Sequence, residues 1–175
     1  PVSVLAAAGM ATGQLEPRIS DSFLAEWTSV RGEAPLRTIA IVDDAPQSQY
    51  LYPEFLLYQR LLERAGWRVV IADATSLELR DDAVFLAEER IDLIYNRVTD
   101  FYLAYELHSV LGRAYESGLV VITPHPAAHA RWADKRLLAW LGDDELLQQA
   151  GLDVDDRSHL RQTIPATEVV EPAAA

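Results

Sequence analysis

The sequence predicts an α/β fold with a mostly parallel sheet, helices on both faces of that sheet and a helical arm at the N-terminus. Short apolar runs rich in β-branched residues alternate along the chain with longer stretches of helical periodicity. Half of the 175 residues are hydrophobic and 24% are charged, so the chain can bury a core. Strands that alternate with helices are typical of a parallel sheet, because each parallel connection needs a crossover.

Four apolar runs are predicted to be buried strands. Between the second and the third run, residues 77–89 alternate weakly around Asp81 and Asp82, which predicts a small hairpin and not a crossover helix. Residues 164–170 are compatible with the start of a further strand. The four predicted strands cover residues 37–43, 67–72, 92–97 and 119–123.

Five segments are predicted to be helices. Ser20 or Asp21 is expected to cap the first helix, and Pro126 lies in the first turn of the fourth. The predicted helices cover residues 19–31, 47–66, 103–117, 126–141 and 143–150.

These elements divide the chain into three predicted parts. Residues 1–35 form an N-terminal arm with its helix, and residues 36–163 form the α/β domain. Residues 164–175 are expected to begin a linker to a further domain.

Charge and composition exclude several kinds of partner. The net charge of -12 opposes contact with nucleic-acid phosphates, and the lysines and arginines form no basic stripe. The chain has no cysteine, so it has neither a disulfide framework nor thiolate chemistry. No apolar run approaches the roughly 20 residues of a membrane helix. We therefore expect a cytoplasmic protein that binds neither nucleic acid nor membrane.

Polar side chains follow three of the predicted strands. In open parallel sheets, ligands bind beyond the carboxyl ends of the strands, so these side chains are expected to converge at one edge. They are Asp43 and Asp44 after the first strand, Asn96, Arg97, Thr99 and Asp100 after the third, and Thr123-Pro124-His125 after the fourth.

Two of these groups have both a binding and a structural interpretation. Asp43 and Asp44 offer oxygen ligands to a hard cation, or they cap a helix and are solvated. The forked guanidinium of Arg97 suits a carboxylate or a phosphate, or it pairs with Asp100 or Asp43.

The histidines do not predict a metal site. His125 and His129 lie four residues apart at a helix start, but the third ligand that they need, Asp134, has a poor helical offset from His129. His108 and His159 have no partner within reach in the sequence, so both are predicted to be surface residues.

Residues 39–46 and 65–70 resemble the opening of a response-regulator receiver, which places paired acids after its first strand. A receiver also needs a phospho-accepting aspartate at the end of its third strand, and Arg97 occupies that place. The chain has no Walker-type glycine loop, so stand-alone nucleotide hydrolysis is not supported.

A second resemblance covers residues 36–170. The phrases at residues 49–55 and 93–101 are similar to the preATP-grasp domain of ATP-grasp ligases of the glutathione-synthetase-like and glutathionylspermidine-synthase-like kind. A polar insert at residues 152–163 departs from simple members of that fold. The junction elements that carry the resemblance are Thr123-Pro124-His125-Pro126, Ala133-Asp134-Lys135-Arg136-Leu137-Leu138, Gly151 and Ile164-Pro165-Ala166-Thr167.

The resemblance implies a three-layer Rossmann-like domain on the substrate side of a ligase, a fragment without catalytic residues of its own. Such ligases phosphorylate a carboxylate with MgATP and pass it to an amine or a thiol, so ATP and Mg are expected in the full-length protein. Arg97, with Asn96, Thr99 and Asp100, is then expected to contact the small-molecule substrate. Lys135 is expected to contact nucleotide phosphates, or it is a solvated helix lysine.

Two other functions stay open. In the first, the chain would be a self-contained receiver-like or flavodoxin-like binding module that acts through a protein partner and uses Asp43 and Asp44 as its sensing edge. In the second, it would be a structural domain that forms a homodimer through exposed apolar helix faces. The ligase interpretation predicts instead that the remaining ATP-grasp lobes of the same chain are its partner.

Overall fold

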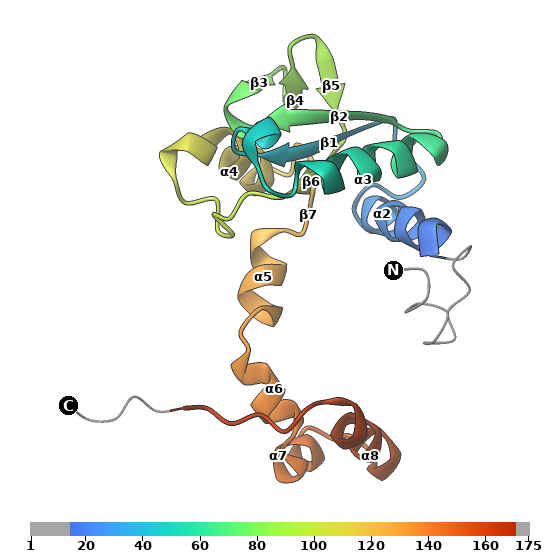
Figure 1. The fold of residues 1–175 in the computed structure, drawn as a ribbon, viewed down its shortest axis with the longest axis vertical. Helices are drawn as coiled ribbons and strands as arrows, with labels where there is room; N and C mark the ends of the chain where they lie inside the picture. Colours follow the sequence, from blue (N-terminus) through green and yellow to red (C-terminus); the bar gives the residue numbers. More distant parts are fainter. Residues whose placement is uncertain (1–14, 171–175) are drawn as a thin grey trace, which may run out of the picture. The chain divides into compact units, whose positions relative to one another are not determined.

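A computed structural model of the chain describes residues 15–170 (Figure 1). The chain divides into two compact units, one ending at Pro126 and the other beginning at Ala127. Residues 1–14 of the predicted arm and residues 171–175 of the predicted linker lie outside the described residues. The predicted grouping of residues 36–163 into one domain stays a prediction.

The first unit is built on a four-stranded parallel sheet in the order β2-β1-β6-β7. All six residues of the central strand β1 are buried, as expected for a parallel strand covered on both faces. The predicted parallel sheet is therefore confirmed. Its strands are β1 (Thr38–Asp43), β2 (Arg68–Asp73), β6 (Leu93–Asn96) and β7 (Val121–Thr123).

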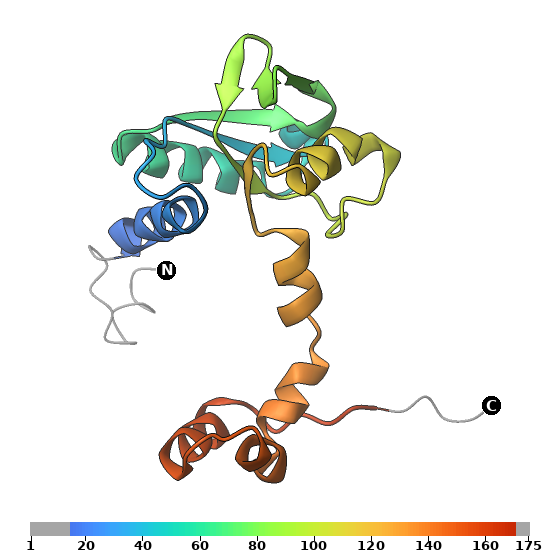
Figure 2. The same ribbon diagram turned by 180° about the vertical axis from the view of Figure 1, so that it is seen from behind.

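Alternate residues of β1 pack into two separate cores. Ile39 and Ile41 pack with Phe55 and Leu62, on the face covered by α2 (Leu15–Arg31) and α3 (Tyr52–Arg64). The opposite face, with Ala40 and Val42, packs against α4 (Ser109–Glu116) and a second, smaller sheet (Figures 1 and 2). Helices therefore flank the parallel sheet as predicted.

The smaller sheet is antiparallel and confirms the predicted hairpin. Asp81 and Asp82 form its first turn with positive φ angles of 47° and 58°, a conformation that aspartate tolerates better than most residues. A third strand, not predicted from the sequence, extends the hairpin. The short helix η3 (Ala74–Ser76) leads into β3 (Leu77–Arg80), β4 (Ala83–Leu86) and β5 (Glu89–Ile91).

Three predicted helix starts are wrong. Helix α2 already begins at Leu15, and the Ser20 hydroxyl donates to the carbonyls of Glu16 and Pro17 within the helix, so Ser20 is not its cap. The predicted helix after Pro46 consists of η2 (Pro46–Ser48) and the separate helix α3. The helix predicted from residue 103 is likewise delayed, to η4 (Glu106–His108) and α4.

The second unit is helical. The helix predicted over residues 126–141 is interrupted, and there the Asp134 carboxylate accepts hydrogen bonds from the backbone and guanidinium of Arg136. A further helix was not predicted, and within residues 164–170 the structure has no strand. The helices are α5 (Pro126–Trp132), α6 (Arg136–Leu141), α7 (Asp144–Gln149) and α8 (Val154–Thr163). Among the described residues, no helix is long and apolar enough to cross a membrane.

Two leucines on α3 provide a test of the core. Leu62 is 0% exposed and Leu57 is 65% exposed. We expect Leu62→Ala to lower the free energy of unfolding by about 3 kcal/mol, because it leaves a cavity, and Leu57→Ala to change it by less than about 0.5 kcal/mol. Urea denaturation followed by circular dichroism measures both. Equal losses in the two variants would contradict the packing of α3.

Candidate functional site

The candidate site lies at the carboxyl edge of the parallel sheet, where β1 and β6 end side by side. Val42 pairs with Asn96, and the carbonyl of Val42 accepts the backbone N–H of Arg97 at 2.8 Å. Asp43 and Asp44 therefore leave β1 next to the point where Arg97 leaves β6. Figure 1 shows these strands parallel at the centre of the sheet.

A buried histidine joins two of the predicted site residues. The Nδ1 atom of His108 lies 2.9 Å from Oδ2 of Asp100, and its Nε2 atom lies 2.8 Å from Oδ1 of Asp44. The histidine side chain is 1% exposed, that of Asp100 is 5% exposed and that of Asp44 is 38% exposed. We call this arrangement the Asp44–His108–Asp100 bridge.

Both ring nitrogens of His108 face carboxylate oxygens, which accept hydrogen bonds and do not donate them when ionised. The arrangement therefore favours the doubly protonated imidazolium. Burial alone lowers the pKa of His108, but the hydrogen bonds and charges of Asp100 and Asp44 outweigh it and raise that pKa above 6.5. Burial raises the pKa of Asp100, yet bonds from the Tyr105 N–H and from His108 bring it below its usual value.

The prediction that His108 is a surface residue is wrong. Asp100 lies eight residues before His108 in a segment that is neither helix nor strand, and Asp44 is 64 residues away, so no regular period in the sequence indicates these partners. The exposed ring of Tyr105 stacks over the imidazole, with 6.1 Å between ring centroids. The imidazole is enclosed in this way, and its two hydrogen bonds join the segment after β6 to the loop after β1.

Arg97 is held at the sheet edge by contacts that leave part of its guanidinium available. One nitrogen donates to the Tyr95 hydroxyl at 3.2 Å, and another lies 3.4 Å from a Glu54 carboxylate oxygen. The guanidinium carbon lies 5.3 Å from the ring centroid of Tyr95 and 5.9 Å from that of Phe55. Among the described residues, the ion pair of Arg97 is with Glu54 and not with Asp100 or Asp43, although the charge of Arg97 acts to lower the pKa of Asp43.

The phenol of Tyr95 is a neutral partner for Arg97. Burial raises the pKa of Tyr95 to about 12, although the positive charge of Arg97 opposes the shift. The hydroxyl therefore stays protonated at neutral pH. The side chain of Arg97 is 25% exposed, and within residues 15–170 its buried Nε atom has no hydrogen-bond partner. The exposed part of the guanidinium can therefore still donate to an oxyanion.

The side chains of Asp43 and Asp44 do not cap η2. Oδ1 of Asp43 accepts the Asp44 N–H at 2.8 Å, while Asp44 is engaged by His108. The N-cap residue of η2 is Ala45, which has no side-chain cap bond. Burial, with the nearby charge of Asp44, raises the pKa of Asp43. The capping interpretation is therefore wrong.

Asp73, which ends β2, belongs to the same edge and was not predicted. Its carboxylate accepts the Ala45 N–H at 2.8 Å and the Thr75 hydroxyl at 2.6 Å. The hydroxyl and the N–H of Thr75 hold the pKa of Asp73 below its usual value. The ionised side chain thus fixes the loop that carries Asp43 and Asp44.

The remaining predicted residues on the segment after β6 differ in burial. Asn96 is 7% exposed and accepts the Val98 N–H through its side-chain oxygen at 3.3 Å, whereas Thr99 is exposed. Leu103 is buried with a φ of 53°, a left-handed conformation that is costly for leucine. A Cβ atom at position 112 would lie 3.1 Å from the Leu103 carbonyl oxygen, so Gly112 of α4 permits this close packing.

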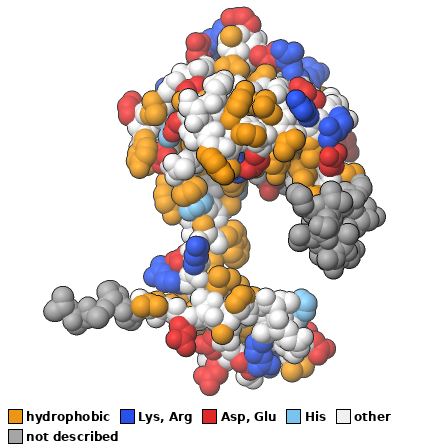
Figure 3. Space-filling view, viewed as in Figure 1, with side chains coloured by type: hydrophobic (Ala, Val, Ile, Leu, Met, Phe, Trp, Pro, Cys, Tyr) orange, Lys and Arg blue, Asp and Glu red, His pale blue; other side chains and the backbone are white. Residues whose placement is uncertain are grey.

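Exposed apolar and aromatic side chains surround the site. They come from the loop before α3 and from the segment between β6 and α4, and we call them the aromatic rim. Figure 3 shows hydrophobic side chains on the side of the unit where that segment lies. Side chains of this kind are typical of a surface that another molecule covers. The rim consists of Tyr50, Leu51, Phe101, Tyr102, Tyr105 and Leu107, which are 41–95% exposed.

The predicted group Thr123-Pro124-His125 lies at the end of β7 at the same edge, where Thr123 pairs with Tyr95 of β6, and the other predicted residues lie in the second unit. Lys135 is exposed and precedes α6 in the second unit, so its nucleotide role stays a prediction. His125 stacks on Tyr115 with ring centroids 5.8 Å apart. His159 is exposed on α8. In the described part of the chain, no group of three or more His, Asp or Glu side chains is arranged to hold a metal ion.

In comparisons with known proteins, the sequence matches no protein-family model and no curated protein.

The bridge predicts a pH dependence of stability. His108 has a raised pKa in the folded chain, so its contribution is fully present below pH 6.5 and is lost as the pH rises through the folded-state value. We expect the free energy of unfolding to fall as the pH rises above about 6.5, and His108→Gln to flatten that fall. His159→Gln, on an exposed histidine, is the control. An unchanged slope in His108→Gln would contradict the imidazolium.

The two carboxylates of the bridge should contribute unequally. Asp100 is almost fully buried, so Asp100→Asn leaves a buried cation without its inner partner, and we expect a loss of about 3 kcal/mol in the free energy of unfolding. Asp44 is partly solvated, so Asp44→Asn should cost only about 1 kcal/mol. Chemical denaturation at neutral pH measures the difference, and a reversed order would contradict the assigned burial.

Proposed function

We propose that the α/β unit is the substrate-side domain of an ATP-dependent carboxylate–amine or carboxylate–thiol ligase of the ATP-grasp type, with the three-layer Rossmann-like architecture of a preATP-grasp domain. The observation that carries the proposal is the position of Arg97. It follows β6 at the carboxyl edge of the sheet, is partly exposed and has a buried Nε atom that lacks a partner among the described residues. A forked guanidinium in this setting suits a substrate carboxylate or a phosphoryl group.

The two segments that are similar to preATP-grasp domains contact each other, and this contact supports the proposal. Glu54 and Phe55, from the phrase at residues 49–55, contact Arg97, from the phrase at residues 93–101. The two phrases are therefore parts of one structural unit around the arginine. Tyr95 and Phe55 restrict the guanidinium, which lowers the entropy lost when it binds an anion.

The aromatic rim is consistent with a binding site that is completed by a further part of the same protein. Its side chains are too exposed to enclose a ligand alone, and they stand around the edge that carries Arg97. In this proposal the ATP-grasp lobes of the same protein cover the rim and bury the substrate against Arg97. MgATP supplies the activating phosphoryl group, and it is assigned to those lobes because Asp44 is already engaged by His108.

Each residue then has a defined part in the proposed site. Arg97 orients the anionic group of the substrate, and Asn96 and Asp100 shape the backbone that presents it. Thr99, exposed on the same segment, offers a hydroxyl to the substrate. Lys135, in the second unit, contacts nucleotide phosphates in this proposal.

The proposal predicts a selective effect of Arg97 on turnover. In the natural gene product, we expect ADP release from MgATP that depends on a carboxylate together with an amine or thiol. Arg97→Ala should lower kcat/KM about 100-fold, since a charge-assisted bond contributes about 3 kcal/mol. Arg97→Lys, which keeps the charge without the fork, should be intermediate.

The exposed Arg60 on α3 provides the control, because Arg60→Ala removes the same charge away from the edge. Thermal unfolding shows whether Arg97→Ala remains folded. A folded Arg97→Ala protein with unchanged kcat/KM would contradict the role of Arg97 and favour a structural dimerisation domain. Failure of every carboxylate and acceptor to release ADP would contradict the ligase proposal itself.

A further inference from the structure

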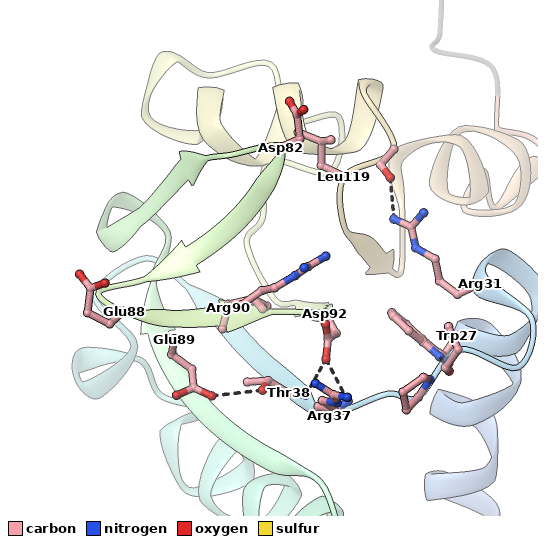
Figure 4. A pocket seen from close by; sticks show the side chains of 14 residues that line it. Trp27, Arg31, Arg37, Thr38, Asp82, Glu88, Glu89, Arg90, Asp92 and Leu119 are labelled. Carbon is pink, nitrogen blue, oxygen red and sulfur yellow. Dashed lines mark hydrogen bonds between the residues drawn. The ribbon is translucent and has the colours of Figure 1, made fainter.

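A concave site lies at the opposite edge of the parallel sheet, where the strands begin. It is a cleft of about 650 Å³ between the end of α2, the strand β5 and the residues that precede β1, β6 and β7 (Figure 4). A volume of this size is typical of sites for small molecules. All of the residues that line it belong to the first unit.

The acidic groups nearest the sheet in this cleft are already occupied. One oxygen of Asp92 accepts the backbone N–H groups of Arg37 at 2.9 Å and of Thr38 at 3.0 Å. Glu89 accepts the hydroxyl of Thr38 at 3.2 Å and forms an ion pair with Arg68 at 2.8 Å. These carboxylates therefore serve the structure: Glu89 is paired with Arg68, and Asp92 is stabilised by two backbone N–H groups.

The two remaining acids lie at the outer ends of the small sheet. Figure 4 shows Asp82 and Glu88 directed away from the middle of the cleft. Glu88 has a side chain that is 92% exposed and pairs with Arg80 at 3.4 Å. Solvent screens both negative charges, so they reduce the affinity of the cleft for an anionic ligand only slightly.

The basic groups of the cleft are less occupied than the acidic ones. Arg31 donates one N–H to the carbonyl of Gly118 at 2.5 Å and keeps its other donors. Arg37 and Arg90 are exposed, and within residues 15–170 their guanidinium groups have neither an ion pair nor a hydrogen bond. Figure 4 shows Arg90 extending from β5 into the cleft, with Arg31 on its opposite wall.

The walls of the cleft are rigid and partly apolar. The indole of Trp27 is 6% exposed and donates to the carbonyl of Ala34 at 2.5 Å, which fixes the turn after α2. Ile91 is buried in the core and borders the cleft together with Pro35 and Leu119. The three arginines therefore project from well-packed backbone, and the apolar wall can contact the carbon skeleton of a ligand.

We propose that this cleft binds a small organic molecule that carries an oxyanion, either a carboxylate or a phosphoryl group. Arg37 and Arg90 supply forked donors, Arg31 supplies a third, and Trp27, Pro35 and Leu119 contact the apolar part of the ligand. The site is separate from the carboxyl edge and does not rest on the ligase proposal. It concentrates unpaired positive charge in one place on a chain of net charge -12.

Titration of the 15N-labelled 175-residue chain tests the proposal. Sodium phosphate and sodium succinate are added separately, with the ionic strength held constant by sodium chloride. We expect saturable shifts of the backbone amides of Arg37, Asp92 and Leu119 with at least one probe. The double variant Arg37→Gln, Arg90→Gln should weaken the Kd at least about tenfold.

A second double variant removes the same charge elsewhere. Arg18 on α2 and Arg60 on α3 are exposed and do not line the cleft, so Arg18→Gln, Arg60→Gln should bind as the parent chain does. Saturation by phosphate alone assigns a phosphoryl ligand, and saturation by succinate alone assigns a carboxylate ligand. Linear shifts with both probes, or equal weakening in both double variants, would overturn the proposal.

Discussion

A buried imidazolium between two carboxylates organises the carboxyl edge of the sheet. Asp44 follows β1, Asp100 and His108 follow β6, and the two hydrogen bonds tie these loops together at 2.8 and 2.9 Å. Such an ion group adds little net stability compared with apolar packing, because desolvation offsets much of the attraction. The ion group instead fixes the positions of the two loops, because any other arrangement of the loops would leave a buried charge without a partner.

The consequences of the bridge extend to the residues around it. The segment between Asn96 and His108 can keep Leu103 in a left-handed conformation because both of its ends are held, one by β6 and the other by the bridge. Asp73 secures the facing loop through the Ala45 N–H. Arg97 therefore stands on a fixed backbone, and the same segment displays the aromatic rim. Fixed charge next to partly exposed apolar side chains is the basis of the proposed substrate-side role.

The sequence was sufficient to predict helices and strands whose hydrophobic pattern or turn residues lie within the element itself. It was insufficient for residues whose contact partners are far away in the sequence. The strand β1 was evident because burial on both faces requires a continuous apolar run, and the hairpin was evident from its paired aspartates. Helix α8 was missed because, in the described structure, none of its residues is buried, so it has no apolar face to detect. His108 and Glu54 were missed as site residues because tertiary folding brings them to Asp44 and Arg97 across intervening elements.

Hydrogen–deuterium exchange of the parent chain and of His108→Gln tests most directly whether the bridge organises the carboxyl edge. The account predicts faster exchange in His108→Gln at residues 97–108 and 44–51, with β1 and β2 still protected as in the parent chain. Such a result would show that the loops depend on the imidazolium and the sheet does not. Unchanged exchange in both loops would contradict the account, because the segment that carries Arg97 would then be held by backbone packing alone.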